Sequence, residues 1–162
     1  MRLTVRSLVS SVAFLGLSFF LVGAAFAQSD PQVGVWKLNV AKSKYSPGPA
    51  PKSGTTKIEA AGAGTKVTVD QVMADGATRH WAFTANYDGK DSPVTGNNPD
   101  ADMVARTRTN ANTVQTISKK GGKVTTTQTS AVSSDGKTRT VTTKGMNAGG
   151  QQVNNVAVYE KQ

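Results

Sequence analysis

The chain offers few residues that could carry out a reaction. His80 is its only histidine and it contains no cysteine, which excludes a thiolate nucleophile, a disulfide and a cysteine metal site. A hydroxyl nucleophile would need His80 as its base, and the residues beside it form neither a nucleophile elbow nor a metal-binding helix motif. A single histidine in a strand is typically a surface residue. The sequence therefore predicts a protein that is not an enzyme and uses no cofactor.

Acidic and amide side chains gather between residues 88 and 102. They are Asp88, Asp91, Asn97, Asn98, Asp100 and Asp102. Hard cations such as calcium take about six to eight oxygen ligands, but this stretch lacks the glycine and the distal glutamate of an EF-hand loop. A solvated turn rich in Asp and Asn is favoured, and no metal site is predicted.

Residues 78–87 combine aromatic rings with a positive charge. Alternate side chains of a strand share a face, and here one face would carry Arg79, Trp81, Phe83, Ala85 and Tyr87. An apolar lining with a few polar groups is typical of small-molecule pockets. If this face points inward, Trp81, Phe83 and Tyr87 would contact a ligand. Arg79 would then lie toward one end, where its charge still reaches water.

Basic residues offer a different binding surface. Arg106 and Arg108 share a strand face with Val104, and the C-terminal half adds Lys119, Lys120, Lys123, Lys137, Arg139 and Lys144. A basic outer face could bind anionic envelope polymers through charge, or its lysines could serve only to block edge-to-edge aggregation. Nucleic acid is not predicted as a partner, because residues 123–144 contain no aromatic side chain for base stacking.

The first 27 residues have the three parts of a cleavable signal peptide. Arg2 and Arg6 precede an apolar run over residues 8–26, which ends in Ala25-Phe26-Ala27. We expect cleavage before Gln28 and a secreted or periplasmic protein with no transmembrane segment left; an uncleaved anchor helix is the alternative. Removal of the two arginines lowers the formal net charge from +9 to +7.

Turn signals divide residues 28–162, a length suited to one domain, into about ten short strands. We expect strands at 33–40, 55–60, 65–73, 78–87, 90–94, 102–109, 113–119, 123–132, 138–144 and 152–160. Asp-Gly, Asn and Gly-Gly turns between them suit tight hairpins, whereas the prolines in 41–54 predict an extended loop. Such an antiparallel up-and-down meander removes its edges by closing into a barrel, and a β-sandwich is the rival all-β fold.

Two strands indicate which faces are buried. In 33–40 the even positions, from Gly34 to Val40, place Trp36 and Leu38 on one face, which we expect in the core. In 123–132 the even positions place Val124 and Val132 at the two ends of a face whose middle positions are Thr126, Gln128 and Ser130, and a face that polar could line a wet interior.

Three motifs resemble a known family. Gly34-Val35-Trp36-Lys37-Leu38, Asp135-Gly136-Lys137 and the terminal Val158-Tyr159-Glu160-Lys161 are similar in order and spacing to those of the cytoplasmic fatty-acid-binding proteins and their lipocalin-like relatives, the calycins. The resemblance implies a closed barrel whose closed end is plugged by Trp36 beneath Lys161. It also implies that Tyr159 points inward toward a ligand.

The chain departs from the family in two places. The proline-rich loop 41–54 stands where the family has a helical lid, so no lid is expected. The family's carboxylate-binding arginine falls on Ala157, and its second interior arginine falls near Ser130 or Ala131. The resemblance therefore predicts a binding protein for a small apolar or amphipathic molecule, without the family's usual carboxylate clamp. If Tyr159 points inward, Val156 and Val158 must point outward. In the alternative orientation these valines point inward, and the interior would then be too full for a ligand.

Overall fold

The structure is a computed structural model that describes residues 29–162, and the predicted signal peptide lies outside them. In this part the chain forms ten strands and no helix. The strands are β1 (Gly34–Lys44), β2 (Ser53–Ala61), β3 (Gly64–Val72), β4 (Thr78–Asn86), β5 (Asp88–Gly96), β6 (Met103–Asn110), β7 (Thr113–Lys120), β8 (Lys123–Val132), β9 (Thr138–Met146) and β10 (Gln152–Lys161). No helix long and apolar enough to cross a membrane is present in residues 29–162.

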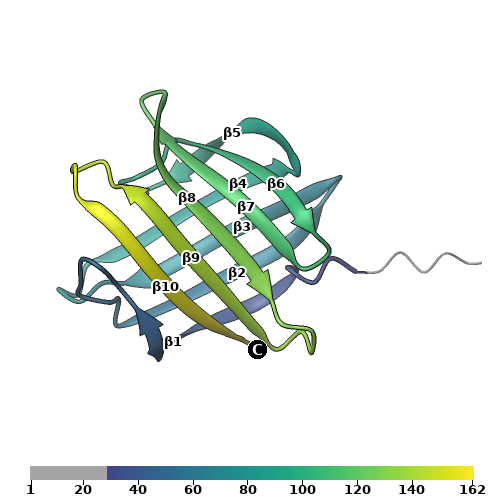
Figure 1. Cartoon of the computed structure of the whole chain (residues 1–162), viewed down its shortest axis with the longest axis horizontal. Helices are drawn as coiled ribbons and strands as arrows, with labels where there is room; N and C mark the ends of the chain where they lie inside the picture. Colours follow the sequence, from purple (N-terminus) through teal and green to yellow (C-terminus); the bar gives the residue numbers. More distant parts are fainter. Residues whose placement is uncertain (1–28) are drawn as a thin grey trace, which may run out of the picture.

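The ten strands close into an antiparallel up-and-down barrel (Figure 1). Each strand pairs with its neighbours in the chain, and β1 closes the ring by pairing with β10. In that pairing Trp36 lies opposite Lys161 and Leu38 lies opposite Tyr159. The predicted barrel, including its closure between the first and last strands, is confirmed, and a sandwich is rejected.

The hairpins follow from turn chemistry. Gly76 and Gly136, each after an aspartate, have φ values of 92° and 70°, a region that other residues avoid because of their Cβ atom. Each glycine amide donates to the carbonyl three residues earlier, at 3.0 Å to Met73 and 2.9 Å to Ser133. The turns thereby fix the register of β3 with β4 and of β8 with β9.

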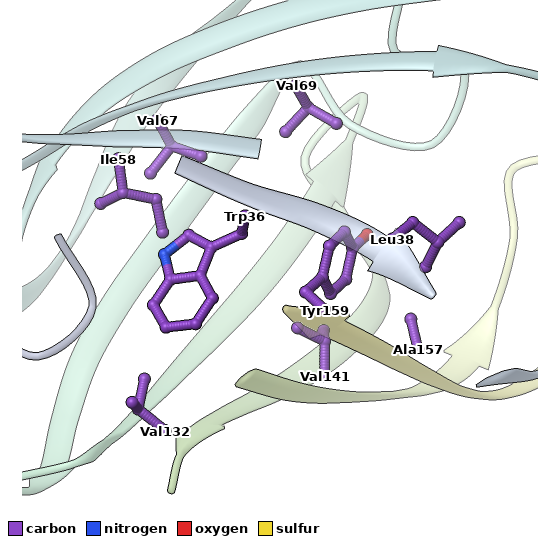
Figure 2. Close-up of a cluster of buried hydrophobic side chains, with 9 residues drawn as sticks. All are labelled: Trp36, Leu38, Ile58, Val67, Val69, Val132, Val141, Ala157 and Tyr159. Carbon is purple, nitrogen blue, oxygen red and sulfur yellow. The ribbon is translucent and has the colours of Figure 1, made fainter. Parts of the chain in front are cut away.

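The hydrophobic core lies inside the barrel. It contains Trp36, Leu38, Ile58, Val67, Val69, Val132, Val141, Ala157 and Tyr159. The Trp36 ring is fully buried and lies between Ile58 and Val132 (Figure 2). Because Ala157 and Tyr159 face inward, Val156 and Val158 are only half-buried.

The first strand differs from the prediction in two ways. Strand β1 continues to Lys44, so the predicted loop 41–54 is limited to residues 45–52. The first proline of that loop is Pro47, and the backbone amides before Pro47 can still pair with β10. The register with β10 shifts between Asn39 and Lys44. This irregularity turns Val40 away from the core, and the predicted burial of Val40 is wrong because its exposed fraction is 37%.

Candidate functional site

The barrel encloses a cavity of about 420 Å³. Strand direction places the loops 45–52, 97–102 and 147–151 at the same end of the barrel, and residues from all three line the cavity. We call this end the mouth. The opposite end, where β1 begins and β10 ends, is the floor.

The floor is closed by the segment that precedes β1. The Gln32 side chain is fully buried; its Nε2 donates to the backbone oxygens of Asn112 and Ser130 at 3.0 and 3.1 Å. The Trp36 indole donates to the Gln32 carbonyl at 2.9 Å, and the Lys161 ammonium lies 5.2 Å from the centre of the Trp36 ring. The arrangement places Trp36 and Lys161 together at the closed end.

The predicted ligand-binding residues divide into two groups. Arg79, Trp81, Phe83 and Tyr159 line the cavity, with Arg79 toward the mouth. Tyr87 does not line it: the residue follows the end of β4, near the floor, and its hydroxyl donates to Asp30 Oδ2 at 2.6 Å. Strand alternation correctly placed Tyr87 on the same inward face as Trp81 and Phe83. It could not show that the cavity ends before this face reaches Tyr87 at the floor.

Opposite sides of the cavity differ in chemistry. In a ring of ten strands β3 lies opposite β8, and β4 lies opposite β9. Strands β3 and β4 contribute Val67, Val69, Trp81 and Phe83, an apolar wall with Gln71 and Arg79 at its mouth end. Strands β7 to β9 contribute a mostly polar wall that also includes Val141; its polar members are Thr116, Ser118, Thr126, Gln128, Ser130, Arg139 and Thr143. The half-polar face predicted for 123–132 therefore lines the cavity, although Val124 at its start is 60% exposed.

Two buried arginines line the lower half of the cavity, and sequence reasoning missed both as interior groups. Arg106 is 2% exposed and Arg139 is 7% exposed. Burial lowers the pKa of Arg139 to about 10 and also lowers that of Arg106. A pKa of about 10 leaves Arg139 charged at neutral pH, and guanidinium groups keep their proton in proteins, so the interior holds two positive charges.

The two guanidinium groups differ in how well they are paired. Arg139 Nε donates to Ser130 Oγ at 2.7 Å and to Gln32 Oε1 at 3.3 Å. Arg106 donates through one terminal nitrogen to the Thr65 hydroxyl and lies 5.8 Å from the centre of the Phe83 ring. Its Nε has no hydrogen-bond partner, and no other buried side-chain nitrogen or oxygen in residues 29–162 shares that condition.

A third arginine is neutralised at the floor. Arg108 pairs with Asp30 Oδ2 at 2.5 Å and lies 4.2 Å from the centre of the Tyr87 ring. The same carboxylate accepts the Tyr87 hydroxyl. Burial, followed by this hydrogen bond, raises the pKa of Tyr87. Asp30 therefore ties the N-terminal segment to β6 and to the end of β4.

The predicted basic outer face is wrong for three of its members. Arg106 and Arg108 share a face of β6 with Val104, and Arg139 shares a face of β9 with Val141. Both valines are buried in the interior, so the three arginines point into the barrel. Alternation identifies residues that share a face but not which side that face turns to. The lysines of the set remain outside, and Lys119 pairs with Asp91 at 2.8 Å.

His80 lies on the outside of the barrel. Its Nδ1 is 2.7 Å from Asp70 Oδ1, and both side chains are more than 60% exposed. Within residues 29–162 the structure shows no group of three His, Cys, Asp or Glu residues that could hold a metal ion. In the Asp- and Asn-rich stretch, Asp100 accepts a hydrogen bond from the Ala148 amide, and Asp102 accepts one from the Gly121 amide. These two aspartates therefore connect neighbouring loops at the mouth.

The comparisons with known proteins give little. No family model matches the chain, and no curated protein matches it. A solved structure to which it is similar is the zebrafish ileal bile acid-binding protein complexed with cholic acid, at 15% identity and a TM-score of 0.48, over 82% of this chain and 99% of that one. The barrel described above rests on the strand pairing of this chain itself.

Proposed function

We propose that the protein is a non-catalytic binding protein for a small amphipathic molecule held inside the barrel. The observation that carries the proposal is the cavity of about 420 Å³, within the range of about 300–1,000 Å³ typical of small-molecule sites. Trp81 and Phe83 would contact the apolar part of the ligand. Tyr159 would contact it from β10, and Arg79 would lie beside the mouth.

The buried arginines favour a ligand with a negative charge. An unpaired buried donor costs about 1–3 kcal/mol, and more when the group is charged, and Arg106 Nε is such a donor. Guanidinium groups match carboxylate and similar anions through paired N–H donors. A ligand whose anionic group reaches the lower half of the cavity would remove this cost, and its apolar part would extend toward Trp81 and the mouth.

We also propose that the protein acts outside the cytoplasm, in the periplasm or as a secreted protein. The support is the N-terminal sequence, whose Ala25-Phe26-Ala27 exit predicts cleavage before Gln28. N-terminal sequencing of the exported protein should begin at Gln28. An intact Met1 in a membrane fraction would reject the cleavage site.

The binding proposal can be tested with anilinonaphthalene sulfonate, which joins an apolar ring system to an anion. Titration should give saturable dye emission and quenching of tryptophan fluorescence, with an affinity nearly unchanged by salt. Trp81→Phe should lose most of the quenching, because the remaining Trp36 lies at the floor. Dye binding without any change in tryptophan emission would contradict a cavity site.

Heparin serves as the comparison ligand for the outer surface. If the exposed lysines bind anionic envelope polymers, heparin should bind with an affinity that falls steeply as salt rises, and Trp81→Phe should leave that binding unchanged. Salt-sensitive heparin binding together with no saturable response to the dye would favour the polyanion function over the cavity.

A further inference from the structure

Apolar side chains gather on the outer surface at the rim of the mouth. Val124 is 60% exposed, Met146 is 55% exposed, and Met103 is also exposed. They lie at the start of β8, the end of β9 and the start of β6, and all three strand ends belong to the mouth of the barrel (Figure 1). Apolar side chains that gather in one exposed region, rather than singly, mark an interaction site.

A β-bulge turns Val124 toward the outside. Ser118 on β7 pairs with Thr126, but the next residue, Lys119, pairs with Val124, so Thr125 is an extra residue in β8. Val124 therefore shares the outer face of Lys119. Without the bulge, strict alternation would place Val124 on the inner face with Thr126.

Neighbouring residues hold the bulge in place. The Thr125 hydroxyl donates to the backbone oxygens of Asp100 and Ser118 at 2.7 and 3.1 Å. On β9 a Cβ at Gly145 would overlap the backbone oxygen of Thr125, so only glycine lets the bulged strand come this close. Bulges commonly re-aim a side chain. The fold thereby fixes Val124 at the surface, where it adds nothing to the core.

Lysines surround these apolar residues. Lys120 and Lys123 flank the turn between β7 and β8, and Lys144 lies two residues before Met146, on the same face of β9. Within residues 29–162 none of the three lysines forms an ion pair. We define the rim patch as Met103, Lys120, Lys123, Val124, Lys144 and Met146.

Acidic side chains at this rim already have partners inside the protein. Asp91 pairs with Lys119 at 2.8 Å. Asp100 accepts the Ala148 amide, and Asp102 accepts the Gly121 amide. The three lysines of the rim patch therefore remain available to an anionic partner.

The composition of the rim patch favours a lipid surface over a protein surface. Protein interfaces are enriched in aromatic residues and arginine and depleted in lysine, whereas the rim patch contains lysine and neither aromatic residues nor arginine. Lysines attract anionic lipid headgroups, and apolar side chains beside them can enter the boundary between headgroups and acyl chains.

We propose that the rim patch docks the mouth end of the barrel onto an anionic lipid bilayer. Val124 and Met146 enter the headgroup region, and Lys120, Lys123 and Lys144 contact acidic headgroups. This inference goes beyond the proposed function, because the rim patch lies on the outer surface and needs no ligand in the cavity.

Insertion can be tested with a fluorescent label. The chain contains no cysteine, so Val124→Cys creates a single attachment site for a dye whose emission depends on polarity. Vesicles of phosphatidylglycerol and phosphatidylcholine should shift the emission to the blue, because the dye leaves water. The matched control is Val35→Cys, an exposed valine at the floor end of β1, which should show no shift. Equal shifts at both positions would overturn the inference.

The charge contribution can be tested by cosedimentation with the same vesicles at low salt. Lys123→Gln should weaken binding about fivefold, the effect of one basic residue near an anionic surface. Lys137→Gln removes the same charge from the loop between β8 and β9 at the floor, and it should leave binding nearly unchanged. Equal losses from both changes would show adsorption through net charge alone. No binding of the wild-type protein would also overturn the inference and favour a protein partner for the rim patch.

The two proposals fail in different experiments. Titration with the sulfonate dye, without vesicles, tests only the cavity. A barrel that binds the dye but not the anionic vesicles keeps the proposed function and rejects docking on the bilayer. A barrel that inserts the label at position 124 but does not bind the dye rejects only the proposed function.

Discussion

At the scale of single residues, Trp36 is the side chain on which the closed end depends. It is fully buried, donates to Gln32 and lies beneath Lys161. Gly34 makes this stacking possible: a Cβ there would lie 2.6 Å from Lys161 Cε, and its φ is 146°. The position therefore needs glycine both for its backbone and for the space above it.

We expect Trp36→Ala to lower the free energy of unfolding by about 3–5 kcal/mol, the usual cost of deleting a core aromatic. Lys161→Met should cost only about 0.5–2 kcal/mol, the range for a cation on an aromatic face. Urea unfolding followed by circular dichroism measures both. An unchanged midpoint for Trp36→Ala would show that the ring does not plug the barrel.

Arg106 should have the opposite effect on stability. Replacing it with methionine removes the unpaired buried donor and its charge, and we expect Arg106→Met to raise the free energy of unfolding by about 1–3 kcal/mol and to abolish binding of the sulfonate dye. The matched control is Arg108→Met on the same strand face, which should lower stability because it removes the partner of Asp30. Equal destabilisation by both changes would mean that Arg106 is a structural residue.

The tyrosines report on burial through their titration. Burial, and then the charge on Tyr159, raise the pKa of Tyr45 above its ordinary value of 10.0, and burial raises that of Tyr87. The unfolded chain therefore loses these protons first, so stability should fall as the pH rises above about 10. Tyrosinate absorbance should show delayed ionisation in the native protein and ordinary ionisation in denaturant. Coincident curves would contradict the burial of both rings.

At the scale of elements, the N-terminal segment is part of the barrel although it is not a strand. The Gln32 amide satisfies two backbone oxygens and accepts from Ser130 Oγ and from Arg139. We expect Gln32→Ala to destabilise the protein by about 1–3 kcal/mol, because it leaves buried groups unpaired. Hydrogen exchange should show faster opening at the floor end of β8, with little change at its mouth end. A uniform change along β8 would argue against a local role.

Strand positions could be predicted from the sequence because turn residues mark the hairpins, and alternation in β4 correctly grouped Trp81 with Phe83. Interior polar groups could not be predicted in the same way. Arg106 shares a strand face with Val104, and Arg139 shares one with Val141, so each face combines a charge with an apolar residue. Alternation alone does not say whether such a face is inside or outside, and only the closed ring shows it. Gln32 carries no local signal at all, since its partners Asn112 and Ser130 lie far along the chain.

At the scale of the whole molecule, binding and stability are coupled through the cavity. A ligand that binds only the folded barrel stabilises it by mass action, about 2.7 kcal/mol at one hundred times its dissociation constant. The sulfonate dye at that excess should therefore raise the urea midpoint of the wild-type protein. It should leave the urea midpoint of Arg106→Met unchanged, because that variant has lost the guanidinium group whose Nε has no partner within residues 29–162, while Arg139 stays paired with Ser130 and Gln32.

Heparin at the same excess distinguishes a ligand bound inside the barrel from one bound to its outer surface. An outer-surface ligand also stabilises whatever folded protein it binds, so its shift should persist in Arg106→Met and disappear at high salt. The dye shift should instead persist at high salt, because the guanidinium groups lie where ions screen them weakly. A dye shift that survives Arg106→Met but vanishes with salt would place the anion on the outer lysines, and the charge inside the barrel would then be without a ligand.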